Sequence, residues 1–228
     1  VIKEKMECKM RGSCFALIIG ISSVVATSSS AADPVCDVGI YGDSPSFVVL
    51  TRGQHGLEYS YADGTVGDFE SSDTRVVCAE DGLLADGTFM ARQDLLVTDT
   101  VFDADGVALA GRLIERTGAN ADTTLVVYAH GSESSAWLDR VRDPYQMVGR
   151  GLSVFVYDKR GTGASGGTYV QNVPRLAADL AIAWTEARRL ADIRFGRFGL
   201  IGLSQGGWVA PYAAETAGAE FVIVGYGL

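Results

Sequence analysis

Four short apolar runs in the second half of the chain limit its fold more than any other feature does. They occupy residues 124–128, 153–157, 198–201 and 221–224. Such continuous runs are typical of strands that are buried on both faces of a parallel sheet. Helical patterns separate the runs, and the clearest covers residues 174–190, where apolar residues recur at spacings of three and four. Alternating strands and helices predict an α/β fold with a mostly parallel sheet and right-handed crossovers.

Two β-rich regions precede these runs. Residues 96–114 contain two strand-like segments around an Asp-Gly turn at 105–106, which predicts a hairpin. Residues 33–93 hold short strand-like segments and a second Asp-Gly turn, at 63–64. We therefore expect a small antiparallel module over 33–93, packed against a main domain over 94–228.

The charge balance excludes some classes of partner. The 228 residues carry a formal net charge of −9, with a pI near 4.7. Nucleic acids and anionic membrane surfaces both need clustered Lys and Arg, so we expect neither as a partner. The acidity does not identify a substrate.

The first 32 residues have the pattern of a secretion signal. A positive head is followed by an uncharged apolar stretch over 14–26, and small residues over 28–32 offer a cleavage site. The apolar stretch is too short to cross roughly 30 Å of hydrocarbon as a helix. We expect a cleaved signal peptide, a secreted or periplasmic protein, and no stable membrane anchor. An anchor or a buried helix is the alternative.

Two of the four cysteines, Cys36 and Cys78, remain after the signal is removed. An even pair in a chain bound for an oxidising compartment is a candidate disulfide. Two free buried thiols are the alternative. Two cysteines and two distant histidines do not form a zinc spacing, so we expect no metal site.

A glycine-rich turn directly follows the run 198–201 and precedes a helical pattern: Gly202-Leu203-Ser204-Gln205-Gly206. In this strand–turn–helix context, Gly-x-Ser-x-Gly predicts a nucleophilic serine at the tip of a strained turn. The positions two before and two after Ser204 crowd each other in such a turn, and both are glycine. The following helix would direct N–H groups and its positive dipole end toward a reacting oxygen. A glycine-rich loop with an incidental serine is the alternative.

A second polar segment, His130-Gly131-Ser132, ends the run 124–128 and is expected at the same sheet edge. A backbone N–H from this loop would complete an oxyanion hole with the N–H of Gln205. We expect His130 and Gly131 to shape the loop, with the imidazole hydrogen-bonded to neighbouring backbone. A role for His130 as general base is the less favoured alternative.

Residues 161–166 match the dinucleotide pattern Gly-x-Gly-x-x-Gly, but their context does not fit it. No helix is expected to open at the third glycine, because residues 168–172 are polar or extended. We expect instead a tight loop, held by the charges of Asp158 and Arg160.

Together, residues 157–165 and 202–211 resemble the α/β-hydrolase superfamily, especially its esterase and serine-aminopeptidase or prolyl-oligopeptidase-like branch. The resemblance covers roughly residues 94–228 and implies an α/β-hydrolase fold. It implies Ser204 as nucleophile, backbone N–H groups of Gln205 and Ser132 as oxyanion donors, and acyl transfer to water without a cofactor. The module over 33–93 is loosely similar to β-rich extensions that precede such domains.

The triad order departs from this family. In the family an acid and then a histidine follow the serine, whereas the residues after Ser204 include Glu215 and Glu220 but no histidine. His55 lies on the wrong side of that order. We therefore expect an incomplete copy of a longer protein, stopping at about the sixth strand of the sheet and lacking an efficient general base as printed.

The function expected of the full-length protein is secreted serine hydrolysis of carboxylic esters or peptide-type amides through an acyl-enzyme on Ser204. A non-catalytic binding protein on the same scaffold is the alternative.

Overall fold

The computed structural model describes residues 36–53, 56–69, 74–138, 140, 142–191 and 196–227. The expected signal segment over 1–32 and His55 lie outside these residues. Residues from Pro34 onward form one compact unit. No helix in the described part of the chain combines the length and apolar character needed to cross a membrane.

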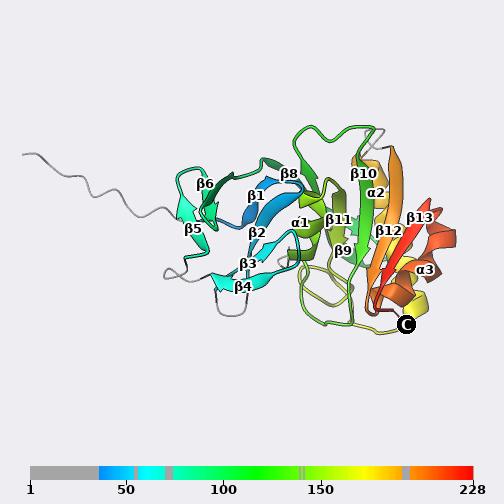
Figure 1. Ribbon diagram of the computed structural model, residues 1–228. Helices are drawn as coiled ribbons and strands as arrows, with labels where there is room; N and C mark the ends of the chain where they lie inside the picture. Colours follow the sequence, from blue (N-terminus) through cyan, green and yellow to red (C-terminus); the bar gives the residue numbers. More distant parts are fainter. Residues whose placement is uncertain are drawn as a thin grey trace, which may run out of the picture. The chain divides into compact units, whose positions relative to one another are not determined.

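A six-stranded sheet forms the centre of the molecule (Figure 1), in the order β13-β12-β10-β11-β9-β8. Its strands are β8 (Leu95–Asp103), β9 (Ala108–Arg116), β10 (Thr124–Ala129), β11 (Ser153–Tyr157), β12 (Arg197–Leu203) and β13 (Phe221–Gly225). The last four are mutually parallel, and β8 and β9 form an antiparallel hairpin that joins the sheet through β11. The apolar runs and the hairpin predicted from the sequence therefore form this sheet.

Both faces of the central strands are covered, which explains why β10 and β11 bury almost every side chain. The edge strand β13 differs, since Ile223 and Val224 are exposed, so the expected burial on both faces is wrong for residues 221–224. In β10, Leu125 and Val127 belong to one hydrophobic cluster, whereas Val126 and Tyr128 belong to another. The first cluster includes residues of α2 (Val173–Ala191) and α3 (Gly206–Ala217), and the second includes Val148 of α1 (Arg142–Gly149). Successive strand residues point to opposite faces, so a strand covered on both sides buries every side chain.

The residues before the central sheet form two antiparallel sheets. One has the order β1-β2-β3-β4, with β1 (Gly39–Asp43), β2 (Ser46–Arg52), β3 (Leu57–Tyr61) and β4 (Val66–Phe69). The other contains β5 (Val76–Ala79), β6 (Gly82–Ala85) and β7 (Thr88–Ala91). The turn before β4 is closed by the Thr65 N–H, which donates to Asp63 Oδ1 at 2.8 Å.

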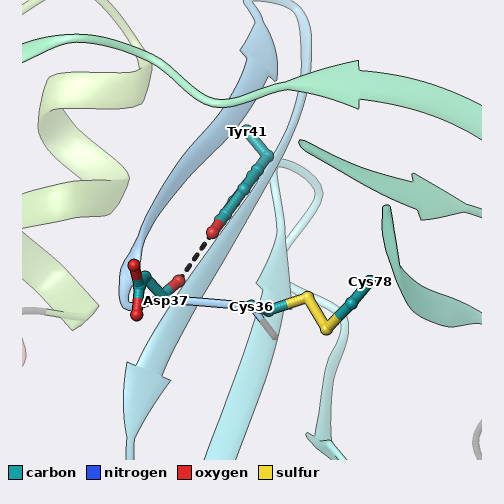
Figure 2. The surroundings of a disulfide bond; sticks show 4 residues. All are labelled: Cys36, Asp37, Tyr41 and Cys78. Carbon is teal, nitrogen blue, oxygen red and sulfur yellow. Dashed lines mark hydrogen bonds between the residues drawn. A yellow bond between two sulfur atoms is a disulfide. The ribbon is translucent and has the colours of Figure 1, made fainter. Parts of the chain in front are cut away.

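A disulfide joins the two small sheets, between Cys36, just before β1, and Cys78 in β5 (Figure 2). The hydroxyl of Tyr41 donates to the Asp37 carbonyl at 2.7 Å beside it. Both contacts anchor the chain entering β1.

The β1–β4 sheet shares a core with the central sheet. Ile40, Phe47 and Val49 belong to the same cluster as Val126 and Val148. From α1, the Gln146 amide also donates to the Ser60 carbonyl at 3.0 Å. The antiparallel module thus packs on the sheet face opposite to α2 and α3.

Candidate active site

Ser204 occupies the turn between β12 and α3 and has a left-handed backbone, with φ +54°. A side chain in this region normally costs about 1–2 kcal/mol. The turn is secured by backbone hydrogen bonds: Ser204 N–H donates to the Gly225 carbonyl at 2.9 Å, and Gly207 N–H donates to the Ser204 carbonyl at 2.8 Å. Ser204 itself is exposed. The geometry is that of a nucleophile elbow, with the serine at the tip of the turn.

The two glycines that flank Ser204 are required by close backbone contacts. A Cβ at Gly202 would lie 2.0 Å from the Gly206 carbonyl oxygen, as the expected crowding requires. A Cβ at Gly206 would instead lie 1.8 Å from the carbonyl oxygen of Ala129, at the end of β10. The elbow is therefore packed tightly against the start of the loop that follows β10.

Gln205, directly after the serine, is the N-cap residue of α3 and has helical backbone angles of φ −54° and ψ −37°. The first N–H groups of a helix have no partner within the helix, and they carry the positive end of its dipole. Ser204 therefore lies at the helix N-terminus, where developing negative charge is stabilised.

His130 is buried within the loop after β10. Its ring stacks on Trp137, with centroids 4.6 Å apart and planes 17° apart. Among the described residues neither ring nitrogen makes a hydrogen bond of ordinary geometry, although Nδ1 lies 3.6 Å from Glu133 Oε2 and the Gly131 backbone lies close enough to raise the pKa of His130 slightly. Burial, with the nearby positive charge of Lys159, lowers the pKa of His130 to about 2. The imidazole is therefore neutral at physiological pH and shapes the loop by stacking.

Gly131 and Ser132, which follow His130, accept hydrogen bonds through their carbonyl groups from residues between β11 and α2. Gly131 is buried, and its carbonyl accepts a hydrogen bond from Lys159 Nζ at 2.5 Å. Ser132 is exposed, and its carbonyl accepts from the Tyr169 hydroxyl. Lys159 Nζ also donates to Gln205 Oε1 at 3.2 Å. The structure thus brings Gly131 and Gln205 together through Lys159.

Lys159 was not predicted as a site residue. It directly follows β11 and is buried, although lysine is almost never fully buried without a partner. Burial lowers its pKa to about 8, and the negative charge of Glu133 opposes this shift. The available signal in the sequence was a charged residue at the carboxyl end of a buried parallel strand.

Asp158 connects the same loops through the backbone. Its Oδ1 accepts from Trp137 N–H at 2.6 Å and from Leu138 N–H at 3.1 Å, and its Oδ2 accepts from Ala164 N–H at 2.9 Å. Asp158 therefore holds the loop after β11, as predicted, and also the loop after β10.

Arg160 holds the loop after β11 from the opposite side. Its guanidinium makes two hydrogen bonds, at 2.6 and 2.5 Å, to the fully buried Asp179 of α2. α2 begins at Val173, well after the third glycine of the Gly-x-Gly-x-x-Gly pattern. The segment is a tight loop and lacks the helix that a dinucleotide-binding turn requires.

A polar cavity of about 450 Å³ lies beside the loop after β10. Residues of the β2–β3 region and of the segment before and within α1 line it: Thr51, Arg52, Gly53, Glu58, Glu133, Trp137, Arg140, Arg142 and Asp143. Neither Ser204 nor Gln205 lines this cavity, so it is not the space above Ser204.

Comparisons with known proteins agree with this geometry. A family model described as serine aminopeptidase, S33, matches residues 120–224, which include the elbow and both neighbouring loops. A search of the curated proteins finds no match.

Solved structures of similar fold were also found. A hypothetical protein from Pseudomonas aeruginosa is 20% identical with a TM-score of 0.50, and the match covers 57% of this chain and 42% of that one. Brefeldin A esterase, a bacterial homologue of human hormone sensitive lipase, is 19% identical with a TM-score of 0.49, covering 59% and 41%. A Pyrococcus furiosus esterase is 26% identical with a TM-score of 0.42, covering 51% and 45%.

The chain thus matches less than half the length of each of these proteins. The sheet order, the turn at Ser204 and the family match lead to the same assignment. Residues 120–224 are therefore similar to the serine aminopeptidase family, and the described part of the chain has the α/β-hydrolase fold.

Proposed function

We propose that this protein is a serine hydrolase that cleaves carboxylic esters or peptide-type amides through an acyl-enzyme on Ser204. The observation that carries the proposal is the left-handed backbone of an exposed serine between a parallel strand and a helix. A strained residue at such a position is costly to keep, and strain of this kind clusters at functional sites. The family match, whose description names a serine aminopeptidase, supports the same chemistry.

In the proposed reaction, the Ser204 hydroxyl attacks the substrate carbonyl and a general base takes its proton. The negative charge that develops on the carbonyl oxygen is held by the backbone N–H groups of Gln205 and Ser132. Each such donor typically contributes about 10²–10³ in rate. Collapse of the tetrahedral species expels the alcohol or amine and leaves the acyl group on Ser204, and water then releases the acid.

The general base is not assigned to a described residue. His130 is the one histidine in the described ranges, and its buried ring is stacked on Trp137. Beyond Ser204, Glu220 is engaged in the fold, since its Oε1 accepts from Phe198 N–H at 3.3 Å.

Covalent labelling with a fluorophosphonate probe tests the nucleophile directly. We expect the probe to add its mass to the peptide that contains Ser204 in the wild type, and the Ser204→Ala variant to remain unlabelled. Ser134→Ala, an exposed serine in the loop after β10, is the matched control and should label as the wild type does. Absence of labelling would favour the alternative, a non-catalytic binding protein on this scaffold.

Two substrate series separate the possible activities. Hydrolysis of p-nitrophenyl esters of increasing acyl length, without release of p-nitroaniline from aminoacyl p-nitroanilides, assigns an esterase. The reverse pattern assigns an aminopeptidase. Either activity must be lost in Ser204→Ala, because otherwise it belongs to a contaminant or to another nucleophile.

We also propose that the protein is secreted or periplasmic. The signal-like pattern over residues 1–32 supports this, and so does the Cys36–Cys78 disulfide, because such bonds persist in oxidising compartments. Expression with the native N-terminus should yield an exported protein that begins at about Asp33 by intact mass. An uncleaved chain retained in the cytoplasm would contradict the proposal.

A further inference from the structure

Lys159 is a buried cation between the two loops that form the candidate site. Its residue is 4% exposed, and Nζ donates to the Gly131 carbonyl at 2.5 Å and to Gln205 Oε1 at 3.2 Å. The first acceptor belongs to the loop after β10 and the second to the residue next to Ser204. One side chain from the end of β11 therefore connects the carboxyl ends of β10 and β12.

Tyr169 strengthens this connection from the loop that precedes α2. The Lys159 ammonium lies 5.5 Å from the centre of the Tyr169 ring, within the range of a cation–π interaction. The Tyr169 hydroxyl donates to the carbonyl of Ser132. Consecutive carbonyl groups, those of Gly131 and Ser132, are therefore each held by one member of the Lys159–Tyr169 pair.

The position of these carbonyl groups matters because the backbone is continuous. The peptide unit that carries the Gly131 carbonyl also carries the Ser132 N–H, which is one of the two proposed oxyanion donors. Fixing that carbonyl fixes the plane of the donor. A displacement of about 1 Å at a reacting centre costs on the order of 10² in rate.

We propose that Lys159 is a positioning residue that ties the loop after β10 to the nucleophile elbow and orients the Ser132 N–H relative to Ser204. The catalytic part of this inference rests on the proposed function, whereas the tie between the two loops does not. The positive charge of Lys159 also lies against the side chain of Gln205, the residue next to Ser204. The charged or titratable groups that face it are Glu133 and His130 from the loop after β10 and Tyr169 from the loop before α2, while the elbow presents the neutral Gln205.

Three variants distinguish the hydrogen bonds by which Lys159 connects the two loops from the effect of its positive charge. Lys159→Met removes both, and Lys159→Gln keeps an N–H donor for the Gly131 carbonyl without a charge. Tyr169→Phe keeps the ring beside Lys159 but removes the hydroxyl that donates to Ser132 and accepts from Gln171 Nε2. Arg197→Met, which removes an exposed cation at the opposite end of β12, is the matched control.

Hydrogen–deuterium exchange of peptides covering residues 130–138 measures the tie without any need for activity. We expect amide exchange there to be at least tenfold faster in Lys159→Met, close to wild type in Lys159→Gln, and unchanged in Arg197→Met. Unchanged exchange in Lys159→Met, with the variant folded by circular dichroism, would overturn the proposal.

The rate of fluorophosphonate labelling measures the effect on Ser204. We expect it to fall about 10- to 100-fold in Lys159→Met, with partial recovery in Lys159→Gln. Since burial lowers the pKa of Lys159 to about 8, the wild-type rate should also fall as pH rises through 8, and Lys159→Gln should lack this fall.

The two readouts keep the proposals distinguishable. If the wild type does not label, the proposed function fails and the exchange data alone decide whether Lys159 ties the loops. If the wild type labels and Lys159→Met labels equally fast with the same pH profile, the positioning role is overturned while the proposed function stands.

Discussion

The carbonyl oxygen of Gly206 lies 2.0 Å from the point where a side chain at Gly202 would begin. Real Cβ atoms do not approach backbone oxygen so closely, so the elbow closes only with glycine at 202. We expect Gly202→Ala to lower the free energy of unfolding by roughly 1–3 kcal/mol, as overpacked sites do.

Urea denaturation measures this effect, with Gly166→Ala as control. A Cβ at Gly166 meets its nearest atom, the Ala108 carbonyl oxygen, at 3.5 Å, which is ordinary contact. Equal free energies of unfolding for the two variants would show that the turn does not require the close contact between Gly202 and the Gly206 carbonyl.

Replacing Ser204 by glycine should stabilise the protein while it removes the proposed nucleophile. A left-handed residue with a side chain costs about 1–2 kcal/mol, and glycine avoids that cost. We expect Ser204→Gly to raise the free energy of unfolding by about 1 kcal/mol relative to Ser204→Ala, which keeps a Cβ. Thermal denaturation compares the two variants. A Ser204→Gly protein less stable than Ser204→Ala would argue against strain at this turn.

Asp158 is expected to be the most sensitive carboxylate of the site loops. It accepts three backbone N–H groups from two loops, and Asp158→Asn would set an amide N–H₂ against one or more of these donors. We expect roughly 2–4 kcal/mol lower stability. Asp63→Asn, an exposed side chain that accepts from Thr65 N–H, is the control and should change stability little. Chemical denaturation of both variants gives the comparison.

His130 should remain neutral well below its usual pKa, because burial lowers that pKa from 6.5 to about 2. Below pH 6.5 the unfolded chain binds a proton that the native His130 does not, so this residue makes stability fall as pH drops from 6.5 toward 2. We expect His130→Gln to lose less stability than the wild type between pH 6.5 and 4.

Two measurements check the His130 prediction. Unfolding free energies at several pH values give the difference in slope. Nuclear magnetic resonance should show an imidazole signal, assigned by its absence in His130→Gln, that does not titrate between pH 4 and 8. A midpoint near 6.5 would contradict the burial of this ring.

Local patterns were sufficient to predict the strands and the serine turn. The runs at 124–128 and 153–157 form β10 and β11, because a strand covered on both faces needs apolar residues at every position. The turn at Ser204 was predictable because Gly202 is required by a close contact with the backbone of Gly206, only four residues away. The spacing of the two glycines in the sequence therefore already indicates the turn.

The contacts between loops were not predictable in the same way. Lys159 and Gln205 are 46 residues apart, and nothing in their local sequence says that one donates to the other. His130 was expected to bond to neighbouring backbone, and its stacking on Trp137, seven positions later in the loop, was not foreseen.

The sequence by itself therefore determined the strands of the central sheet, the α/β class and the residue at the tip of the elbow, since propensity, periodicity and steric limits act between neighbours. The tertiary structure decided which side chains meet at the carboxyl ends of β10, β11 and β12, because parallel pairing brings distant loops to one edge. There burial and charge act together, leaving Lys159 enclosed between two loops and His130 uncharged.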